Sequence, residues 1–438
     1  MKVDFNCNSG VLNLKFLLDQ NEGMDCTGSV KMERDECKIV LPKDWTVYSI
    51  HPDLFALAVI LIVYPFIDKE LNIGIGVSKE FNEEFHSLTG KKIIPVDNRL
   101  KPRKAERNSR PALAYSGGVD STVALTLLPE NTFCVFLDRI LPKDDSNIKI
   151  YDKRAIYKAC KFLSDIGRDV HVIETDLEYV RSPKGFAIEY STSIPAILLA
   201  DYKDGFDSIA SGTVLESAYL EFKDFNKSRL YNIEWRKLFN IVDLLRNDVT
   251  AGLSNVATLK ILHKDQRYVH IAKSCMKSDG LKNCMDCWKC FRKTLIIKTL
   301  NKEQITDELI DRLFLISEAR TYLKRIPLRF ENQFAYITAN YEGSHPLMKL
   351  LKNLTKEYNN IEVYWLEKWY SPSVEHLCPK YKNTIIENIK KYVEVMSEEE
   401  QKIVQNWDSR NIYNLDNYKK THSRFLDTLN NHRKNKKK

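Results

Sequence analysis

No stretch of this 438-residue sequence is both long and apolar enough to span a bilayer. The most apolar run, LFALAVILIVYPFI at residues 54–67, has fourteen residues and contains Pro65, so it predicts a buried helix. The first residues, MKVDFNCNSG, lack the basic and then apolar pattern of a secretory leader. We therefore expect a soluble, cytoplasmic protein with no membrane partner.

The sequence also lacks internal repeats, and its only low-complexity segment is the lysine-rich end, HRKNKKK at 432–438, which we expect to be a frayed, solvated tail. The net charge is +8, but elsewhere Lys and Arg are interleaved with Asp and Glu. Such mixing is typical of an ordinary solvated surface, so nucleic acid is an unfavoured partner, although a basic face for an anionic ligand stays open.

Four of the ten cysteines lie close together in SCMKSDGLKNCMDCWKCFRK, residues 274–293, with the spacing C-x8-C-x2-C-x2-C. In a reducing compartment such a cluster favours a metal site over disulfides. Four thiolates suit tetrahedral zinc, and the turn at Asp279-Gly280 can return the first cysteine to the others. The predicted ligands are Cys275, Cys284, Cys287 and Cys290.

Two alternatives to zinc remain at this cluster: an iron–sulfur centre, which uses the same four thiolates, and four inert buried thiols. Because the spacing leaves no obvious open coordination position, we predict a structural metal. The six other cysteines are scattered and predict small buried side chains. They are Cys7, Cys26, Cys37, Cys134, Cys160 and Cys378.

The second motif lies in RPALAYSGGVDSTVALTLLPENTFCVFLDR, residues 110–139. ALAY predicts a strand, SGGVDS a glycine turn, TVALTLL a helix that ends before Pro129, and TFCVFLD a second buried strand. This order is one βαβ unit of a parallel sheet. A glycine turn before a helix can present backbone N–H groups to a phosphate.

The predicted anion-binding groups of this turn are the backbone amides of Gly117, Gly118 and Val119 and the hydroxyls of Ser116, Ser121 and Thr122. Asp120 can hold a magnesium ion on the phosphates, and Asp120 and Ser121 are the predicted catalytic residues. Asp138, at the end of the second strand, is predicted to line the same nucleotide pocket. No lysine follows the glycines, so the loop is not of the GxxxxGK[ST] type.

SGGVDS resembles the pyrophosphatase loop of the PP-loop ATP-pyrophosphatases. The resemblance implies a doubly wound parallel sheet of the adenine nucleotide alpha hydrolase type and cleavage of ATP to AMP and pyrophosphate. With the cysteine cluster, residues 110–300 resemble more narrowly the 7-cyano-7-deazaguanine synthase (QueC-like) family. In that family the four cysteines hold a structural zinc, a serine precedes the first, as Ser274 does here, and an arginine follows the last, as Arg292 does.

The segment EYSTSIPAILLADYKDGFDSIASGTVLESAYL, residues 189–220, predicts a helix from Pro195 to Tyr202 and a strand at DSIASG. Where the family has an Arg-Asn pair that handles the substrate, this sequence has Ile197 and Leu198. The deazaguanine substrate is therefore left open. Glu216 and Ser217 follow the strand and are either ligand contacts or ordinary surface residues.

We predict three regions: an N-terminal α+β domain at 1–105, a QueC-like PP-loop ATPase domain with the zinc site at 106–300, and a mainly helical region with a basic tail at 301–438. KVDFNCNS, NLKFLL, KIVLP and LNIGIGVS predict strands in the first, and residues 98–111 a linker. TIIENIKKYVEVM predicts an amphipathic helix, and YWLEKWY at 364–370 is more typical of core than of a base-stacking surface.

The favoured function is an ATP-dependent adenylating C–N ligase, using ATP, Mg2+ and Zn2+, that activates a carboxylate or amide for attack by ammonia or an amine. Its expected partners are a carboxylated small molecule or a protein or peptide terminus, further copies of the chain, and other proteins. The alternatives are an epimerase that adenylates a peptidoglycan precursor and a nucleotide-binding subunit of a phage-defence complex. A tRNA thiolase would need a catalytic cysteine, and Cys134, inside a buried strand, is a poor candidate.

Overall fold

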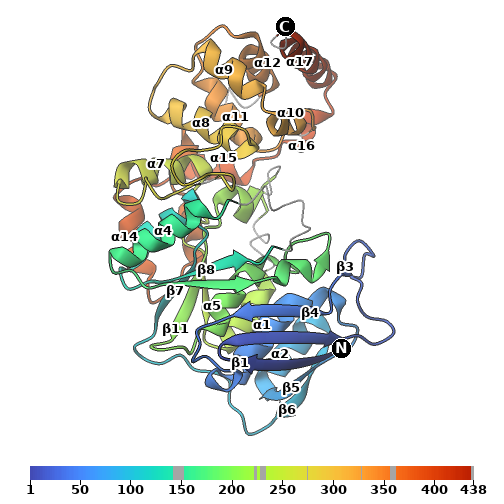
Figure 1. Cartoon of the computed structure of the whole chain (residues 1–438). Coiled ribbons are helices and arrows are strands. Elements are labelled where there is room, and N and C mark those ends of the chain that lie inside the picture. Colours follow the sequence, from blue (N-terminus) through green and yellow to red (C-terminus); the bar gives the residue numbers. More distant parts are fainter. Residues whose placement is uncertain are drawn as a thin grey trace.

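The computed structural model describes residues 1–141, 152–220, 224–226, 233–273, 275–326, 328–355 and 362–435. Within them, one ten-stranded sheet has the order β12-β11-β7-β8-β9-β4-β2-β1-β5-β6. Its strands are β1 (Lys2–Asn8), β2 (Val11–Leu17), β4 (Glu36–Val40), β5 (Glu70–Ser78), β6 (Lys92–Asp97), β7 (Arg110–Ala114), β8 (Phe133–Arg139), β9 (Val170–Thr175), β11 (Phe206–Ala210) and β12 (Leu245–Asn247). The chain is an α/β protein with a large, mostly parallel sheet, above which a group of helices lies in Figure 1.

The predicted βαβ unit is confirmed as β7, α3 (Val119–Leu127) and β8, and the strands β12, β11, β7, β8 and β9 are all parallel. Both faces of these strands are buried. Phe133 and Val135 of β8 face one hydrophobic core, whereas Cys134 and Phe136 face another. We call these five strands the parallel half of the sheet.

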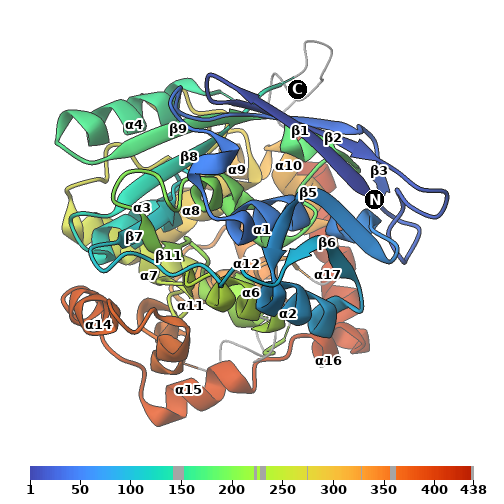
Figure 2. The same ribbon diagram turned by 90° about the horizontal axis from the view of Figure 1, so that it is seen from below.

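Helices form both cores. α1 (Pro52–Val63), α5 (Ile194–Leu198) and α6 (Arg236–Ile241) contribute to the first core, together with α2 (Lys79–Thr89). α3, α4 (Arg154–Asp165) and α7 (Asn255–Asp265) contribute to the second. Figure 2 shows α3 and α4 on the opposite side of β8 from α1. The apolar run at 54–67 therefore forms a buried helix, as predicted.

The N-terminal strands extend the same sheet, because β4 pairs antiparallel with β9 through Ile39 and Thr175. We call β4, β2, β1, β5 and β6 the N-terminal half. Its first three strands show two-residue alternation: on β2, Leu14 is buried and Lys15 is exposed. The four predicted strands of this region are confirmed, whereas α2 and β6 were not predicted. A second, small sheet pairs β3 (Lys31–Met32) with β10 (Arg181–Ser182).

Arg103 holds the predicted linker against the sheet. It is 3% exposed, and all five of its guanidinium N–H groups donate, to Asp201 and to four backbone carbonyls. One of these carbonyls belongs to Ala200, which also accepts from the amide of Phe206. The predicted helix to Tyr202 ends early, at Leu198. Turn hydrogen bonds follow it, from the amide of Ala200 to Ile197 and from the amide of Tyr202 to Leu199.

The C-terminal region is helical. It contains α8 (Trp288–Leu300), α9 (Asp307–Phe314), α10 (Ser317–Leu323), α11 (Glu331–Ala339), α12 (Pro346–Leu354), α14 (Lys382–Lys390), α15 (Glu398–Gln405), α16 (Arg410–Tyr413) and α17 (Asp416–Asn435). Trp365 and Trp369 are buried, so the aromatic segment is core, as predicted. None of the described helices is long and apolar enough to cross a membrane.

Two helix ends differ from the prediction. α14 ends at Lys390 because Trp369 donates its amide to Glu394 and accepts from the amide of Met396, which makes that segment extended. The predicted frayed tail is helical as far as Asn435, and His432 is only 10% exposed in its side chain. Residues 436–438 lie outside the described part of the chain.

Candidate functional site

The glycine loop follows β7 at the carboxyl edge of the parallel half. Gly117 has φ +69°, and a Cβ there would lie 2.3 Å from Cδ1 of Ile156. Both the backbone conformation and the close approach therefore require glycine at this position. Gly118 has φ −77°, and a Cβ there would meet only Oγ of Ser116, at 3.4 Å. Of the two glycines, Gly117 is the one that the fold demands.

The first turn of α3 presents backbone donors. The first helical hydrogen bond runs from the amide of Thr122 to the carbonyl of Gly118 (3.0 Å), so the amides of Val119, Asp120 and Ser121 precede the helical ladder. The predicted hydroxyl donors brace the loop itself. Ser121 Oγ and Thr122 Oγ1 donate to the Gly118 carbonyl at 3.2 and 2.8 Å. Donors and helix dipole together make this turn suited to an anion.

A pocket of about 240 Å³ lies beside this turn, between the ends of β7 and β8 and the cysteine cluster. Its lining includes Ser116, Gly117, Gly118, Asp138, Lys153, Lys273, Cys275 and Lys289. Lys153 pairs with the buried Asp138 (Nζ to Oδ1 2.8 Å). Among the described residues, Lys273 and Lys289 have no ion-pair partner. The pocket therefore offers two cations beside the helix N-terminus.

The Asp120 side chain, 29% exposed, contacts α7 and α8. Thr258 Oγ1 donates to its Oδ1 at 2.9 Å, and Lys293 Nζ lies 4.0 Å from its Oδ2. Burial lowers the pKa of Lys293 to about 8, and the charge of Asp120 acts in the opposite direction. Sequence reasoning missed Thr258 and Lys293 because each lies more than 130 residues from Asp120 in the chain.

Two residues after β11, Glu216 and Gly212, take structural positions. Glu216, predicted as either a ligand contact or a surface residue, is fully buried and accepts hydrogen bonds from the Asn255 amide and the Gln333 side chain. Burial raises the pKa of Glu216. Gly212 was not predicted; a Cβ there would lie 2.5 Å from the amide nitrogen of Ser121, so the loop after β11 packs directly on the first turn of α3.

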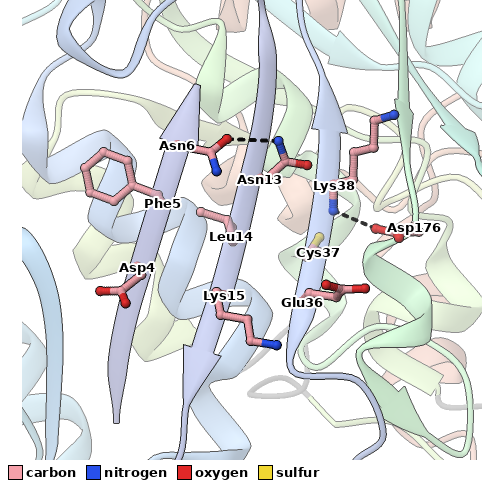
Figure 3. A pocket seen from close by; sticks show the side chains of 10 residues that line it. All are labelled: Asp4, Phe5, Asn6, Asn13, Leu14, Lys15, Glu36, Cys37, Lys38 and Asp176. Carbon is pink, nitrogen blue, oxygen red and sulfur yellow. Dashed lines mark hydrogen bonds between the residues drawn. The ribbon is translucent and has the colours of Figure 1, made fainter. Parts of the chain in front are cut away.

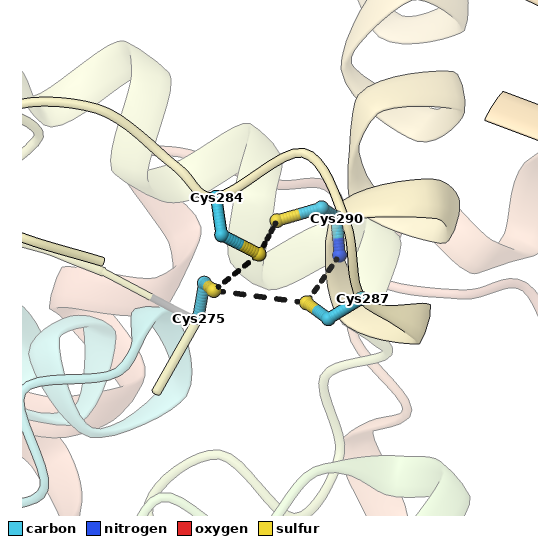
Figure 4. A group of neighbouring side chains, drawn as sticks. All are labelled: Cys275, Cys284, Cys287 and Cys290. Carbon is cyan, nitrogen blue, oxygen red and sulfur yellow. Dashed lines mark hydrogen bonds between the residues drawn. The ribbon is translucent and has the colours of Figure 1, made fainter. Parts of the chain in front are cut away.

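The four cysteines converge, as Figure 4 shows. Their ligand atoms all lie within 4.8 Å of one another, and three Sγ–Sγ distances are 3.0 Å (Cys275–Cys284), 3.6 Å (Cys275–Cys287) and 3.7 Å (Cys284–Cys290). These distances are too long for disulfides, whereas zinc–sulfur bonds of about 2.3 Å place tetrahedral sulfurs about 3.8 Å apart. The cluster can hold a metal such as zinc.

Local structure supports the convergence. Gly280 has φ +86°, and the Asp279 carboxylate accepts from the amides of Leu281 and Lys282, so the predicted turn is present. Cys287 caps α8 by accepting from the amide of Cys290. Hydrogen bonds from Cys287 and Cys290 hold the pKa of Cys275 well below its usual range. Burial raises the pKa of Cys284, and the hydrogen bond to Cys275 raises the pKa of Cys290, so among these three only Cys275 favours the thiolate, the metal-binding form.

The cysteine cluster and the glycine loop form one site. Cys275 lines the pocket, and the amide of Lys273 donates to the Gly117 carbonyl at 2.9 Å. α8 begins at the cluster and carries both Lys289 and Lys293. A metal at the cysteines would therefore fix the helix that directs these lysines toward the loop.

A second group of side chains that could bind a metal consists of Asp311, His345 and His432. Hydrogen bonds between these residues explain their arrangement better than a metal does. Nε2 of His345 and Nε2 of His432 lie 3.2 and 2.7 Å from the same oxygen of Asp311. Nδ1 of His345 accepts from the amide of Leu347, which places the proton of the neutral ring on Nε2, facing Asp311. A metal at Nε2 would need the other tautomer.

Ile197 and Leu198 are 0% and 1% exposed and belong to the core shared with α1. They are therefore core residues. Cys134 is also fully buried, and burial raises its pKa to about 12, which makes it unsuited to catalysis.

A family of unknown function, DUF6395, matches residues 234–408. The matched segment includes the four cysteines and Lys293 but not the glycine loop. No curated protein matches the chain.

Proposed function

We propose that this chain is an ATP-dependent adenylating enzyme of the PP-loop type, similar to the 7-cyano-7-deazaguanine synthases, with a doubly wound nucleotide-binding fold. It converts ATP to AMP and pyrophosphate while activating a carboxylate or amide for attack by ammonia or an amine. One observation carries the proposal: the amides at the start of α3 adjoin a pocket that contains Lys273 and Lys289. In open α/β sheets, ligands bind at this carboxyl edge.

The chain's own residues supply binding and charge stabilisation. Gly117 lets the backbone approach a phosphate, and the amides of Val119 and Asp120 donate to it. Lys273 and Lys289 offset negative charge as pyrophosphate leaves. A magnesium ion bound with ATP would neutralise phosphate charge, and the Asp120 carboxylate, 29% exposed, is the group that would hold it.

Zinc at the four cysteines is the structural part of this proposal. All four coordination positions are taken by thiolates, so the ion has no open position for chemistry. Its role is to hold α8, and with it Lys289 and Lys293, against the glycine loop.

The test pairs ATP affinity by calorimetry with pyrophosphate release in the presence of a panel of carboxylates. We expect Asp120→Asn to bind ATP within a few-fold of wild type and to release pyrophosphate about 10²–10³-fold more slowly, as when one charge-stabilising group is lost. Asp165→Asn, an exposed aspartate on α4, is the matched control and should behave as wild type.

Each other outcome has a distinct meaning. Wild type that binds no ATP contradicts the proposal. ATP binding without pyrophosphate release for any carboxylate would support the rival, a nucleotide-binding subunit. If Asp120→Asn and wild type release pyrophosphate at equal rates, Asp120 has no role in the reaction.

A further inference from the structure

A second polar group lies at the carboxyl edge of the sheet, beyond the glycine loop. Asp248 directly follows β12, and Ser211 directly follows β11, its parallel neighbour. The Asp248 side chain is fully buried, and its Oδ1 accepts from Ser211 Oγ (2.9 Å) and from Arg246 Nη2 (3.2 Å). Its Oδ2 accepts from Nη2 of Arg236. We call Arg236, Arg246 and Asp248 the arginine nest.

The nest contains more positive than negative charge. Two guanidinium groups share one carboxylate, and their side chains are 15% (Arg236) and 3% (Arg246) exposed. Arg246 also lies over the ring of Tyr190, 4.9 Å from its centroid. Arg236 and Arg246 together hold the pKa of Asp248 below its usual value against the effect of burial. The three groups therefore carry one net positive charge in a buried place.

The nest also contains more donors than acceptors. Nε of Arg236 and Nε of Arg246 are buried and have no acceptor among the described residues. The same holds for the hydroxyl of Tyr219, which is 1% exposed. Burial raises the pKa of Tyr219, and the charges of Glu375, Arg236 and Asp248 also act on it. Buried donors are nearly always paired in folded proteins, so three together indicate an acceptor that binds there.

The nest adjoins the glycine loop. Ser211, which donates to Asp248, is followed by Gly212, whose Cα packs against the amide of Ser121. A single glycine therefore separates the nest from the first turn of α3. The nest therefore lies next to the helix turn whose amides form the anion site.

We propose that Arg236 and Arg246 form a carboxylate-binding subsite for the acceptor molecule. A guanidinium offers two parallel N–H donors that match a planar carboxylate. The acceptor role rests on the adenylating function proposed above, whereas carboxylate binding at the nest does not. Arg236, the more exposed of the two, is the group that an entering carboxylate meets first.

The experiment measures thermal stability of the full chain with sodium succinate or pyrophosphate at matched ionic strength, since a ligand that binds the folded state raises Tm. The variants are Arg236→Gln, Gly117→Val and, as a control, Arg410→Gln, an exposed arginine on α16. Arg236→Gln leaves Asp248 paired with Arg246, so it should fold. If it does not, Arg236→Lys, which keeps the charge but loses the fork, replaces it.

We expect succinate to raise the Tm of wild type, Gly117→Val and Arg410→Gln, and this shift to be lost in Arg236→Gln and reduced in Arg236→Lys. Pyrophosphate should stabilise Arg236→Gln but not Gly117→Val. No succinate shift in wild type, or an undiminished one in Arg236→Gln, overturns the subsite. A shift by inorganic phosphate alone that requires Arg236 also overturns the carboxylate assignment. If pyrophosphate does not raise the Tm of wild type but succinate does, the nucleotide function is contradicted and the carboxylate subsite is still supported.

Discussion

The parallel and N-terminal halves of the sheet differ in how many of their faces are covered. In the parallel half, helices cover both faces, and four consecutive residues of β8, Phe133–Phe136, are buried. In the N-terminal half, the strands β1, β2 and β4 have one open face. A hollow on this face is lined by Asp4, Phe5, Asn6, Asn13, Leu14, Lys15, Glu36, Cys37, Lys38 and Asp176 (Figure 3).

Whether helices cover both faces of the sheet determines where its polar side chains can cluster. The open hollow has a volume of about 480 Å³, twice that of the pocket at the glycine loop, but several of its polar side chains already have protein partners. Lys15 pairs with Asp35 (2.6 Å), and Asn13 donates to Asn6 (3.0 Å). In the parallel half the strands are apolar on both faces, so polar residues concentrate at their carboxyl ends. Concentrated polar groups, rather than cavity size, mark the candidate site.

The largest expected effect distinguishes Cys287, at the start of α8, from Cys37, on β4 of the N-terminal half. Cys287→Ser removes a metal ligand and the cap of α8, so we expect loss of metal, a stability loss of more than about 4 kcal/mol, and weaker ATP binding because Lys289 and Lys293 lose their support. Cys37→Ser in the N-terminal half, also buried, is the control and should keep metal and ATP binding. The measurements are elemental analysis, denaturant unfolding and calorimetry.

Elemental analysis should find about one zinc per chain in wild type, because four thiolates make one closed site. Iron with sulfide in its place would contradict zinc. A Cys287→Ser protein that loses its metal yet unfolds as wild type does would show that the metal is not structural.

The next effect concerns two buried aspartates: Asp248, which follows β12 of the parallel half, and Asp53, which lies on α1. Arginines lower the pKa of Asp248, whereas burial, opposed by hydrogen bonds from Ser78, raises the pKa of Asp53. The stability from Asp248 is therefore present above its unfolded pKa and lost as pH falls through the folded value. That from Asp53 is present below its unfolded pKa and lost as pH rises through the folded value.

Urea unfolding of Asp248→Asn and Asp53→Asn between about pH 2 and pH 7 checks this contrast. At pH 7 we expect Asp248→Asn to lose about 3–5 kcal/mol, because two buried arginines lose their partner. This loss should persist down to about pH 4 and shrink only below it, because the folded pKa of Asp248 lies below its usual value. Asp53→Asn should lose less than about 1.5 kcal/mol at pH 7, because its hydrogen-bond donors on Ser78, a hydroxyl and a backbone amide, are neutral. Parallel pH profiles for the two variants would refute the contrast.

The smallest effect on stability compares two glycines with positive φ. Gly117→Val and Gly74→Val should each lose about 1–2 kcal/mol from the left-handed backbone alone. Only Gly117→Val also forces a Cβ against Ile156 and distorts the donors of α3, so only it should abolish ATP binding. Gly118→Ala, at an ordinary φ, should retain binding. Calorimetry that finds wild-type ATP affinity in Gly117→Val would place the nucleotide elsewhere.

Sequence patterns identified the local parts of the candidate site. The strand, glycine turn and helix at 110–128 and the cysteine spacing are each set by contacts between residues fewer than twenty apart. The same reasoning failed where a distant partner intervened. Arg103 donates to the Ala200 carbonyl in the turn that follows α5, and Trp369 ended α14 early. The joining of β4 to β9 had no sequence signal, because alternation on one strand does not say which strand pairs with it.

By itself, the sequence determined the βαβ unit, the turn that requires glycine and the set of four thiols, because backbone sterics and ligand spacing act along short stretches of chain. Tertiary structure alone decided which charges meet: Lys293 with Asp120, and Arg236 with Asp248. Those pairings depend on the burial of helices on both faces of one sheet. Hydrophobic burial is non-directional, so the pattern of apolar residues does not specify which polar side chains it brings together.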